Sequence, residues 1–413
     1  MKWKETEIGR IPEDWDLFKL SDLTSKITKG TTPTTLGCKF VKKGVDFIKA
    51  ESLNDDGTMN PEKFMHIDEE TNKMLSRSQL QKNDLLYTIA GTIGRVSIVK
   101  TNILPANTNQ AVAILRPNLK KVNLFYLRYV LASPAIKTYL LSKEVHAVQA
   151  NLSLTELGNC PIPTPNKVEQ QAIAKILLDL DSKIELNNQM NATLEAMAQA
   201  IFKHWFVDFE FSNEEGKPYR SNGGKIVDNK ELGKRIPLIW KSGKYSDLVT
   251  VSTGKGLKRN DFVENGQFPV IGANGELGRT NKFSSNGAVI LTGRVGTLGT
   301  VYLIHNKAWI SDNVLISRPI YYENYYYSYF TIKTFNFESL NRGSTQPLVT
   351  QTDLKNQIIM IPDKRILHLY NDICSKLFDI IYQNKDTNEN LIQIRDSLLP
   401  KLMSGQIRVN GGS

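Results

Sequence analysis

The 413-residue chain is poor in cysteine and has no long apolar run. Its three cysteines, Cys38, Cys160 and Cys374, lie far apart and follow neither a disulfide framework nor a metal-binding spacing. No stretch reaches the roughly 18 apolar residues of a membrane span, and no apolar signal region follows the charged residues 1–5. The sequence therefore excludes a disulfide scaffold and a membrane-spanning protein, and it favours a reducing, cytoplasmic location.

The chain also lacks a recognisable nucleotide-binding loop. The glycines of residues 293–299 do not follow the dinucleotide-binding pattern. Residues 252–256 lack the second glycine and the hydroxyl spacing of a phosphate-binding loop. We interpret both segments as tight turns, and no catalytic residue, metal ligand or cofactor site is predicted in this chain.

The composition is that of a folded, moderately basic protein. With 40% hydrophobic and 23% charged residues, the chain can bury sizeable cores, and its length favours two or more domains. Lysine and arginine outnumber aspartate and glutamate by 52 to 42, which gives a pI near 9.2. This excess is compatible with a polyanionic partner, but equally with a slightly basic protein that binds none.

An internal repeat organises the chain. A shift of 197 positions lays residues 149–202 over residues 346–399 without a gap, and 13 of the 54 positions are identical. Further upstream the correspondence continues with gaps, since residues 91–96 resemble residues 296–301. Each half of the chain is thus predicted to be a globular region followed by one long helix.

The two globular regions, residues 15–165 and 240–362, are expected to mix strands with short helices. Apolar runs at residues 85–89 and 288–291 predict buried strands, each leading into a glycine-rich turn. The aromatic run at residues 321–330 could stack on nucleic-acid bases or pack as a helix on a sheet. Its place in the repeat matches a packing helix of the first half, which favours core packing.

Polar and basic loops recur in both globular regions and are the candidates for nucleic-acid binding. Lysine and arginine suit phosphates and guanine edges, whereas asparagine and glutamine suit adenine edges. Any one of these loops could instead be an ordinary solvated loop, but their recurrence in both halves favours binding. The candidate DNA-binding residues are Lys29, Thr31, Asn109, Gln110 and Gln149 in the first half and Lys255, Lys258, Arg259, Asn274, Arg294, Arg342, Ser344, Thr345 and Gln346 in the second.

Residues 167–206 and 364–403 show the apolar spacing of a coiled coil. Both predicted seams carry two asparagines at the same steps, and a seam asparagine fixes register by pairing with another polar group. We therefore expect the two helices to pack antiparallel against each other, rather than each on its own domain, with these amides meeting near the middle. Arg395 also falls on the seam, with no acidic residue obviously opposite. The seam residues are Ile173, Leu177, Leu180, Ile184, Asn187, Asn191 and Leu194 in the first helix and Leu377, Ile381, Asn384, Asn388 and Leu391 in the second.

This plan resembles the specificity subunit of type I restriction–modification systems. Residues 169–174 resemble the start of the family's central helix, and residues 202–209 resemble its end. Residues 395–407 are close to the family's C-terminal signature, and residues 344–347 resemble the ending of a target-recognition domain. The resemblance covers nearly the whole chain, and its helix-end motifs are the more specific part.

The resemblance implies an α+β fold with two similar mixed α/β target-recognition domains. Two long antiparallel helices that form a coiled coil would separate them with pseudo-two-fold symmetry, and each helix would span about 60 Å. The implied boundaries are residues 1–165 for the first recognition domain and 166–211 for the central helix. A linker and the second recognition domain would occupy residues 212–362, and the C-terminal helix and tail residues 363–413.

The resemblance also implies a non-catalytic, DNA-binding subunit that reads a bipartite double-stranded target. Its expected partners are two methyltransferase subunits, which bind S-adenosylmethionine and methylate adenine, and ATP-driven motor–nuclease subunits. The chain contains neither the Asn-Pro-Pro-Tyr nor the Asp-Pro-Pro-Tyr methyltransferase motif. This absence fits a subunit that reads DNA while its partners carry the chemistry.

Two other interpretations stay open at the level of sequence. A nuclease or methyltransferase fragment would need a metal or methyl-donor site, and Asp261 and Glu264 near Lys255 and Lys258 come closest, although we interpret them as surface residues. A coiled-coil scaffold without a role on DNA would show no salt-dependent DNA binding, whereas phosphate contacts make affinity fall steeply with salt.

Overall fold

A computed structural model describes residues 2–143, 151–296, 298–343 and 346–409. The chain forms two compact units, of which the first comprises Met1–Leu186 with Thr387–Ser413 and the second Asn187–Asp386. Each unit holds one sheet-containing region together with part of both long helices, α6 (Lys167–Phe206) and α9 (Lys364–Met403). The boundaries predicted at residues 165 and 362 fall just before these helices, whereas the compact units divide within them.

The first unit is built on a four-stranded antiparallel sheet in the order β4-β10-β7-β8. Its strands are β4 (Thr24–Lys29), β10 (Val112–Pro117), β7 (Leu85–Thr88) and β8 (Val96–Ile98). A smaller sheet in the order β6-β5-β9 combines an antiparallel with a parallel pair and comprises β6 (Met65–Ile67), β5 (Val45–Ile48) and β9 (Ala106–Thr108). Two ribbons complete the unit, β1 (Trp3–Thr6) with β2 (Gly9–Pro12) and β3 (Asp16–Lys19) with β11 (Pro161–Thr164).

The second unit repeats this topology strand for strand. Its four-stranded antiparallel sheet has the order β15-β21-β18-β19, with β15 (Val249–Thr253), β21 (Val314–Pro319), β18 (Val289–Gly293) and β19 (Val301–Ile304). The smaller sheet again mixes an antiparallel with a parallel pair and consists of β17 (Gly275–Thr280), β16 (Phe268–Gly272) and β20 (Trp309–Ile310). The ribbons are β12 (Ile226–Asn229) with β13 (Lys234–Pro237) and β14 (Lys241–Lys244) with β22 (Ile358–Ile361). The predicted duplication of an α+β domain is thereby confirmed.

Short helices flank these sheets. In the first unit they are α1 (Leu20–Leu23), α2 (Glu69–Met74), α3 (Leu124–Ala132), α4 (Pro134–Ser142) and α5 (Leu154–Gly158). In the second unit they are α7 (Tyr325–Ile332) and α8 (Gln351–Lys355). Part of the predicted aromatic run forms α7, whose residues are all buried, while Tyr321 and Tyr322 precede it and are 60% and 62% exposed.

The central strands consist of consecutive apolar residues because both faces of each four-stranded sheet are covered. In the first unit, Leu85 and Tyr87 belong to the core that includes α3, whereas the intervening Leu86 faces the smaller sheet with Ile48. Successive side chains of a strand point to opposite faces, so an uninterrupted apolar run is what a doubly covered strand requires. The second unit follows the same rule, with Ile290 on the α7 side and its neighbours Val289 and Leu291 on the other.

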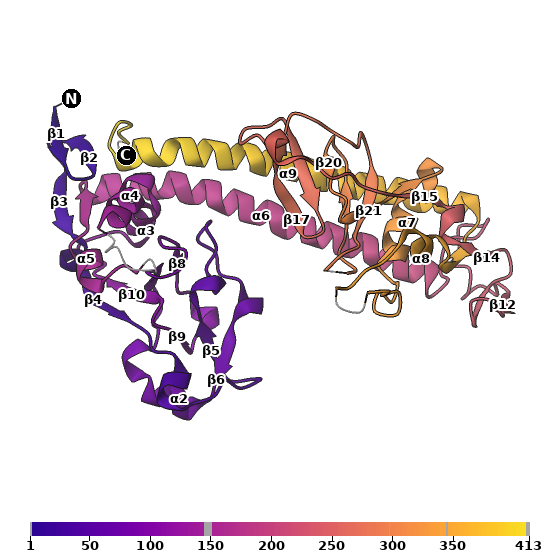
Figure 1. The fold of residues 1–413 in the computed structure, drawn as a ribbon, viewed down its shortest axis with the longest axis horizontal. Helices are drawn as coiled ribbons and strands as arrows, with labels where there is room; N and C mark the ends of the chain where they lie inside the picture. The colour runs from indigo at the N-terminus through magenta and orange to yellow at the C-terminus, as the bar shows by residue number, and fades with distance from the viewer. Residues whose placement is uncertain (1, 144–150, 297, 344–345, 410–413) are drawn as a thin grey trace. The chain divides into compact units, whose positions relative to one another are not determined.

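Within each unit α6 and α9 run antiparallel, side by side (Figure 1). In the second unit, the Asn384 amide donates to Asn191 Oδ1 over 2.9 Å, and the Tyr370 hydroxyl donates to the carbonyl of Ala198. In the first unit, Leu177 of α6 and Leu402 of α9 share one apolar core. Residue numbers thus rise along one helix as they fall along the other, and the predicted antiparallel pairing is confirmed.

The seam arginine finds its acidic partner in the first unit. Arg395 Nη1 lies 3.0 Å from Asp181 Oδ1, and the other oxygen of Asp181 accepts from Arg128 and from the Tyr129 hydroxyl of α3. Sequence reasoning found no acid opposite Arg395 because Asp181 flanks the apolar seam instead of lying on it. The contact ties both long helices and α3 into one polar network.

Of the residues that the structure describes, none belongs to a helix both long and apolar enough to span a membrane.

Candidate nucleic-acid interface

In both units the first strand of the four-stranded sheet ends in a glycine wedged against the backbone that precedes the second strand. Gly30 donates its N–H to the carbonyl of Asn109 over 3.1 Å, and a Cβ at this position would lie 1.8 Å from Thr108 O. Gly254 donates to the carbonyl of Val314 over 3.0 Å, and a Cβ there would lie 2.1 Å from Ser311 O. Only glycine allows this approach, so polar segments from distant parts of the sequence meet at one end of each sheet.

The first of these meeting points, formed by residues 29–32, 109–110 and Arg77, is called the first polar edge below. The Thr32 hydroxyl donates to the side-chain oxygen of Gln110, which leaves the Nε2 donor of this exposed amide for an external acceptor. The Arg77 guanidinium donates to Thr31 Oγ1 over 3.2 Å. The structure therefore brings the candidates Lys29, Thr31, Asn109 and Gln110 together, whereas Gln149 lies outside the described residues.

The second polar edge comprises residues 253–259, 294 and 309–313. Lys255 donates its N–H to the carbonyl of Ile310 over 2.8 Å, and its own carbonyl accepts from the indole N–H of Trp309 over 2.8 Å. Lys255, Lys258 and Arg259 are all exposed. This edge therefore presents three cations on a segment whose backbone is held at its start.

A loop near residue 346 closes the same end of the second sheet. Val349 donates its N–H to the carbonyl of Arg294 over 2.9 Å, and Arg294 donates to the carbonyl of Asn313 over 3.0 Å. The candidates Arg294, Arg342 and Gln346 are thus connected through this loop to the second polar edge, while Ser344 and Thr345 lie outside the described residues. In the first unit, Leu152 makes the equivalent bond to Ile89.

Arg342 is already engaged with a carboxylate. Its Nη2 lies 2.9 Å from Asp353 Oδ1, and the Asp353 side chain is 7% exposed. Although burial raises the pKa of Asp353, the Thr350 hydroxyl and Arg342 outweigh it and lower the pKa below its usual range. Arg342 therefore fixes the loop to α8, and its charge is already balanced by a carboxylate, whereas Lys258 and Arg259 form no ion pair in the described part of the chain.

Asn274 stands apart from the other candidates. It is exposed at the tip of the β16–β17 hairpin, next to Gly275 with φ at +116°. In the described part of the chain, no hydrogen bond or ion pair connects Asn274 to another candidate. The structure groups the remaining described candidates at the ends of the two four-stranded sheets.

Arg77 and Trp309 are two residues of these edges that sequence reasoning missed. Arg77 lies 46 residues from the threonine that it contacts, and Trp309 lies 54 residues from Lys255. Neither residue lies in a polar loop that the sequence marks as a binding candidate. Each comes close to its edge only because of the way the strands are arranged in the folded unit.

The two buried cysteines are not activated as nucleophiles. Burial raises the pKa of the Cys160 and Cys374 thiols to about 12, so both remain protonated at neutral pH. No group of His, Cys, Asp or Glu within the described residues has a metal-binding arrangement.

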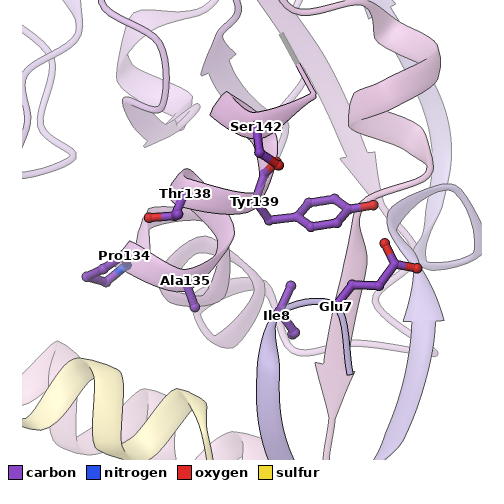
Figure 2. Close-up of a pocket in the computed structure, with 7 residues that line it drawn as sticks. All are labelled: Glu7, Ile8, Pro134, Ala135, Thr138, Tyr139 and Ser142. Atoms are coloured by element: carbon purple, nitrogen blue, oxygen red, sulfur yellow. The ribbon is translucent and has the colours of Figure 1, made fainter. Parts of the chain in front are cut away.

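A pocket of about 370 Å³ lies between the β1–β2 hairpin and α4, as Figure 2 shows. Glu7 and Tyr139 line it, and burial together with the Glu7 carboxylate raises the pKa of Tyr139 to about 12. The phenol therefore keeps its proton at neutral pH, and the pocket contains no residue of either polar edge.

A duplicated fold with a polar, cation-bearing edge on each copy is the arrangement expected of a protein that recognises nucleic acid. The chain belongs to the family of the type I restriction modification DNA specificity domain, whose model matches residues 12–196 and 237–394. The predicted family is thereby confirmed, and the chain is a DNA-specificity component and not an enzyme.

Relatives of full length are found in archaea and bacteria. The type I restriction enzyme MjaIX specificity subunit of Methanocaldococcus jannaschii is 28% identical, over 99% of this chain and 97% of its own length. The HindI specificity subunit of Haemophilus influenzae is 23% identical, over 95% of this chain and 100% of its own length. The crystal structure of a type I restriction–modification S subunit from M. genitalium superposes with a TM-score of 0.55 at 18% identity, covering 95% of this chain and 96% of that one. This last similarity shows the shared fold.

Proposed function

We propose that each unit reads one short segment of a bipartite DNA duplex through its polar edge. The observation that carries this proposal is the repetition of the edge at the same end of the same sheet in both units. A wedged glycine builds it each time, at Gly30 and at Gly254. Two readers in one chain suit a target of two half-sites separated by a non-specific spacer, whose length the helix pair α6–α9 would determine.

The two edges differ in chemistry and therefore in the bases they suit. The first edge offers hydroxyls and amides from Thr31, Asn109 and Gln110, and amides match adenine edges in the major groove. The second edge offers Lys255, Lys258 and Arg259, which match guanine edges and phosphates. We expect an unrelated sequence in each half-site.

The chain would act in a complex whose other subunits carry the chemistry. Two adenine methyltransferase subunits, which bind S-adenosylmethionine, and ATP-dependent motor–nuclease subunits are the proposed partners. The chain itself would then select the DNA site at which those subunits act.

We propose that a methyltransferase subunit docks on exposed apolar side chains of the helix pair in the second unit. Leu369, Ile373 and Ile380 are each at least 36% exposed and share one face of α9, because their spacing follows the helical repeat. Met190 and Met197 of α6 are exposed at 40% and 48%. Apolar side chains at regular spacing on a solvated helix are typical of an interface with a partner.

Replacing Ile373 with glutamate is expected to reduce methyltransferase capture at least ten-fold, because it places a charge in an apolar contact. The measurement is co-purification of the two subunits, with melting temperature as the test of folding. Lys385→Glu makes the same kind of change at an exposed position on the other side of the α9 seam and is the matched control. Equal capture by both variants would move the docking surface elsewhere.

The function itself is tested by co-expressing the chain with its adenine methyltransferase subunit and sequencing methylated adenines genome-wide. The expected result is one bipartite motif, methylated only when the chain is present. Methylation at a continuous motif, or methylation that does not depend on the chain, would refute the proposal. Binding to target duplexes should also weaken steeply as salt rises.

A further inference from the structure

Among the residues that the structure describes, Arg77 is the one arginine of the first unit without a carboxylate partner. This unit contains seven arginines, all within the described residues, and six of them form ion pairs. Arg116 of the neighbouring β10, for example, lies 2.8 Å from the fully buried carboxylate of Asp84. No carboxylate of the described residues therefore neutralises the charge of Arg77.

The Arg77 guanidinium is nevertheless held in place. Its Nη2 donates to Thr31 Oγ1 over 3.2 Å and lies 3.5 Å from the carbonyl of Lys29, while its other N–H groups stay available. The carbonyl of Arg77 accepts from Lys26 Nζ over 2.7 Å. Two neutral oxygens thus orient the guanidinium group without neutralising its charge.

Two cations meet at this point, since Lys26 Nζ donates to the carbonyl of Arg77, and Lys26 and Arg77 are called the basic cluster below. Arg77 is exposed and Lys26 is half-buried. Neither lies within ion-pair distance of a carboxylate in the described part of the chain. Since Arg77 belongs to the first polar edge, the cluster adjoins the side chains that would read the first half-site.

From this geometry we infer that the basic cluster anchors a backbone phosphate of DNA beside the first half-site. The inference rests on the function proposed above. A planar guanidinium with free N–H donors fits phosphate oxygens in a bidentate manner, and the neighbouring Lys26 ammonium group favours a full negative charge over a neutral base edge. Arg77 therefore supplies affinity and register at the first half-site, while the neighbouring amides supply sequence information.

The test measures the affinity of the complete methyltransferase complex for its target duplex over a range of salt concentrations. Arg77→Gln is expected to reduce the slope of log affinity against log salt by about one, with the methylated sequence unchanged. Arg77→Lys should retain most of that slope, because it keeps the charge. Arg10→Gln is the matched control, since Arg10 is exposed in the same unit but paired with Glu5, and it should leave the slope unchanged.

Three outcomes would overturn the inference. An unchanged slope in Arg77→Gln would remove the cluster from the interface. A relaxed preference at one base position would make Arg77 a reader of bases and not of phosphate. Absence of specific binding by the wild-type complex would refute the proposed function itself, and the inference with it.

Discussion

At the residue scale, the two edges reach the same geometry through different side chains. The Arg77 guanidinium contacts Thr31 at the first edge, and the Trp309 indole holds the backbone of the second edge through the carbonyl of Lys255. Both contacts come from distant parts of the sequence, while the wedged glycines belong to the edges themselves. Under the proposed function, the fold would fix the position of each recognition segment and leave its side chains free to vary.

Trp309→Phe tests the support of the second edge. The substitution keeps an aromatic ring but removes the N–H that donates to Lys255 over 2.8 Å. A neutral hydrogen bond contributes about 1 kcal/mol net, so DNA affinity should fall about five-fold. The complex that contains Trp309→Phe should also methylate more of the sites whose second half-site differs from the target sequence. Unchanged affinity would show that the Trp309 bond does not position the basic segment.

A second residue-scale prediction concerns Arg408, which bonds both Glu169 and Asp14. The Arg408 guanidinium beside Asp14 lowers the pKa of this carboxyl below its ordinary 3.8. The contribution to stability is therefore fully present above about pH 4 and is lost as the pH falls through the lowered pKa.

Arg408→Gln removes this contribution and should lower the melting temperature at pH 7. The difference from the wild type should shrink as the pH is lowered from 5 towards about 3. Thermal melts of both proteins across this range provide the measurement. A difference that stays constant down to pH 3 would contradict the role of the Asp14 ion pair.

At the scale of elements, the long helices are the part of the fold that sequence predicts best. Residues 167–206 and 364–403 carry a strict apolar repeat over ten turns or more, and the helices end where the pattern ends. Their register depends on polar contacts inside that pattern. The amide of Asn384 meets Asn191 in the second unit, and Asn388 lies 3.5 Å from the carbonyl of Ile184 in the first.

A double-mutant cycle on Asn191 and Asn384 measures that contact. Either single leucine substitution leaves one half-buried amide facing an apolar side chain and should cost about 1–3 kcal/mol of unfolding free energy. The double substitution should recover most of this loss, because leucine pairs fill coiled-coil seams. Denaturant unfolding of the four proteins is the measurement. Additive effects of the two substitutions would contradict a direct amide pair.

Sequence predicted the candidate site less completely than the helices. Periodicity identified strands such as β7 and β18, because a short apolar run is a local signal. The contact of Arg77 with Thr31 depends on how η4 (Ser76–Ser78) packs beside β4, which no local pattern encodes. Asp181 was missed for the same reason, since its partnership with Arg395 appears only once the helix register is known. Loop composition did identify most residues of both polar edges, but it could not separate Asn274 from them.

At the scale of the whole molecule, the chain consists of two copies of one recognition fold, each continuous with part of a shared helix pair. Under the proposed function, two similar sheets with different polar edges would allow one chain to recognise two unrelated half-sites. A change in one unit should then leave the other half of the target unaffected.

The independence of the two half-sites is the central claim, and methylated-adenine sequencing of paired variants tests it most directly. Thr31→Ala with Gln110→Ala changes the first polar edge, and Lys255→Ala with Lys258→Ala changes the second. Each pair is expected to relax or abolish recognition of one half-site and to preserve the other half-site and the spacer. A variant pair that alters both half-sites, or loss of the same half-site in both variants, would contradict the account.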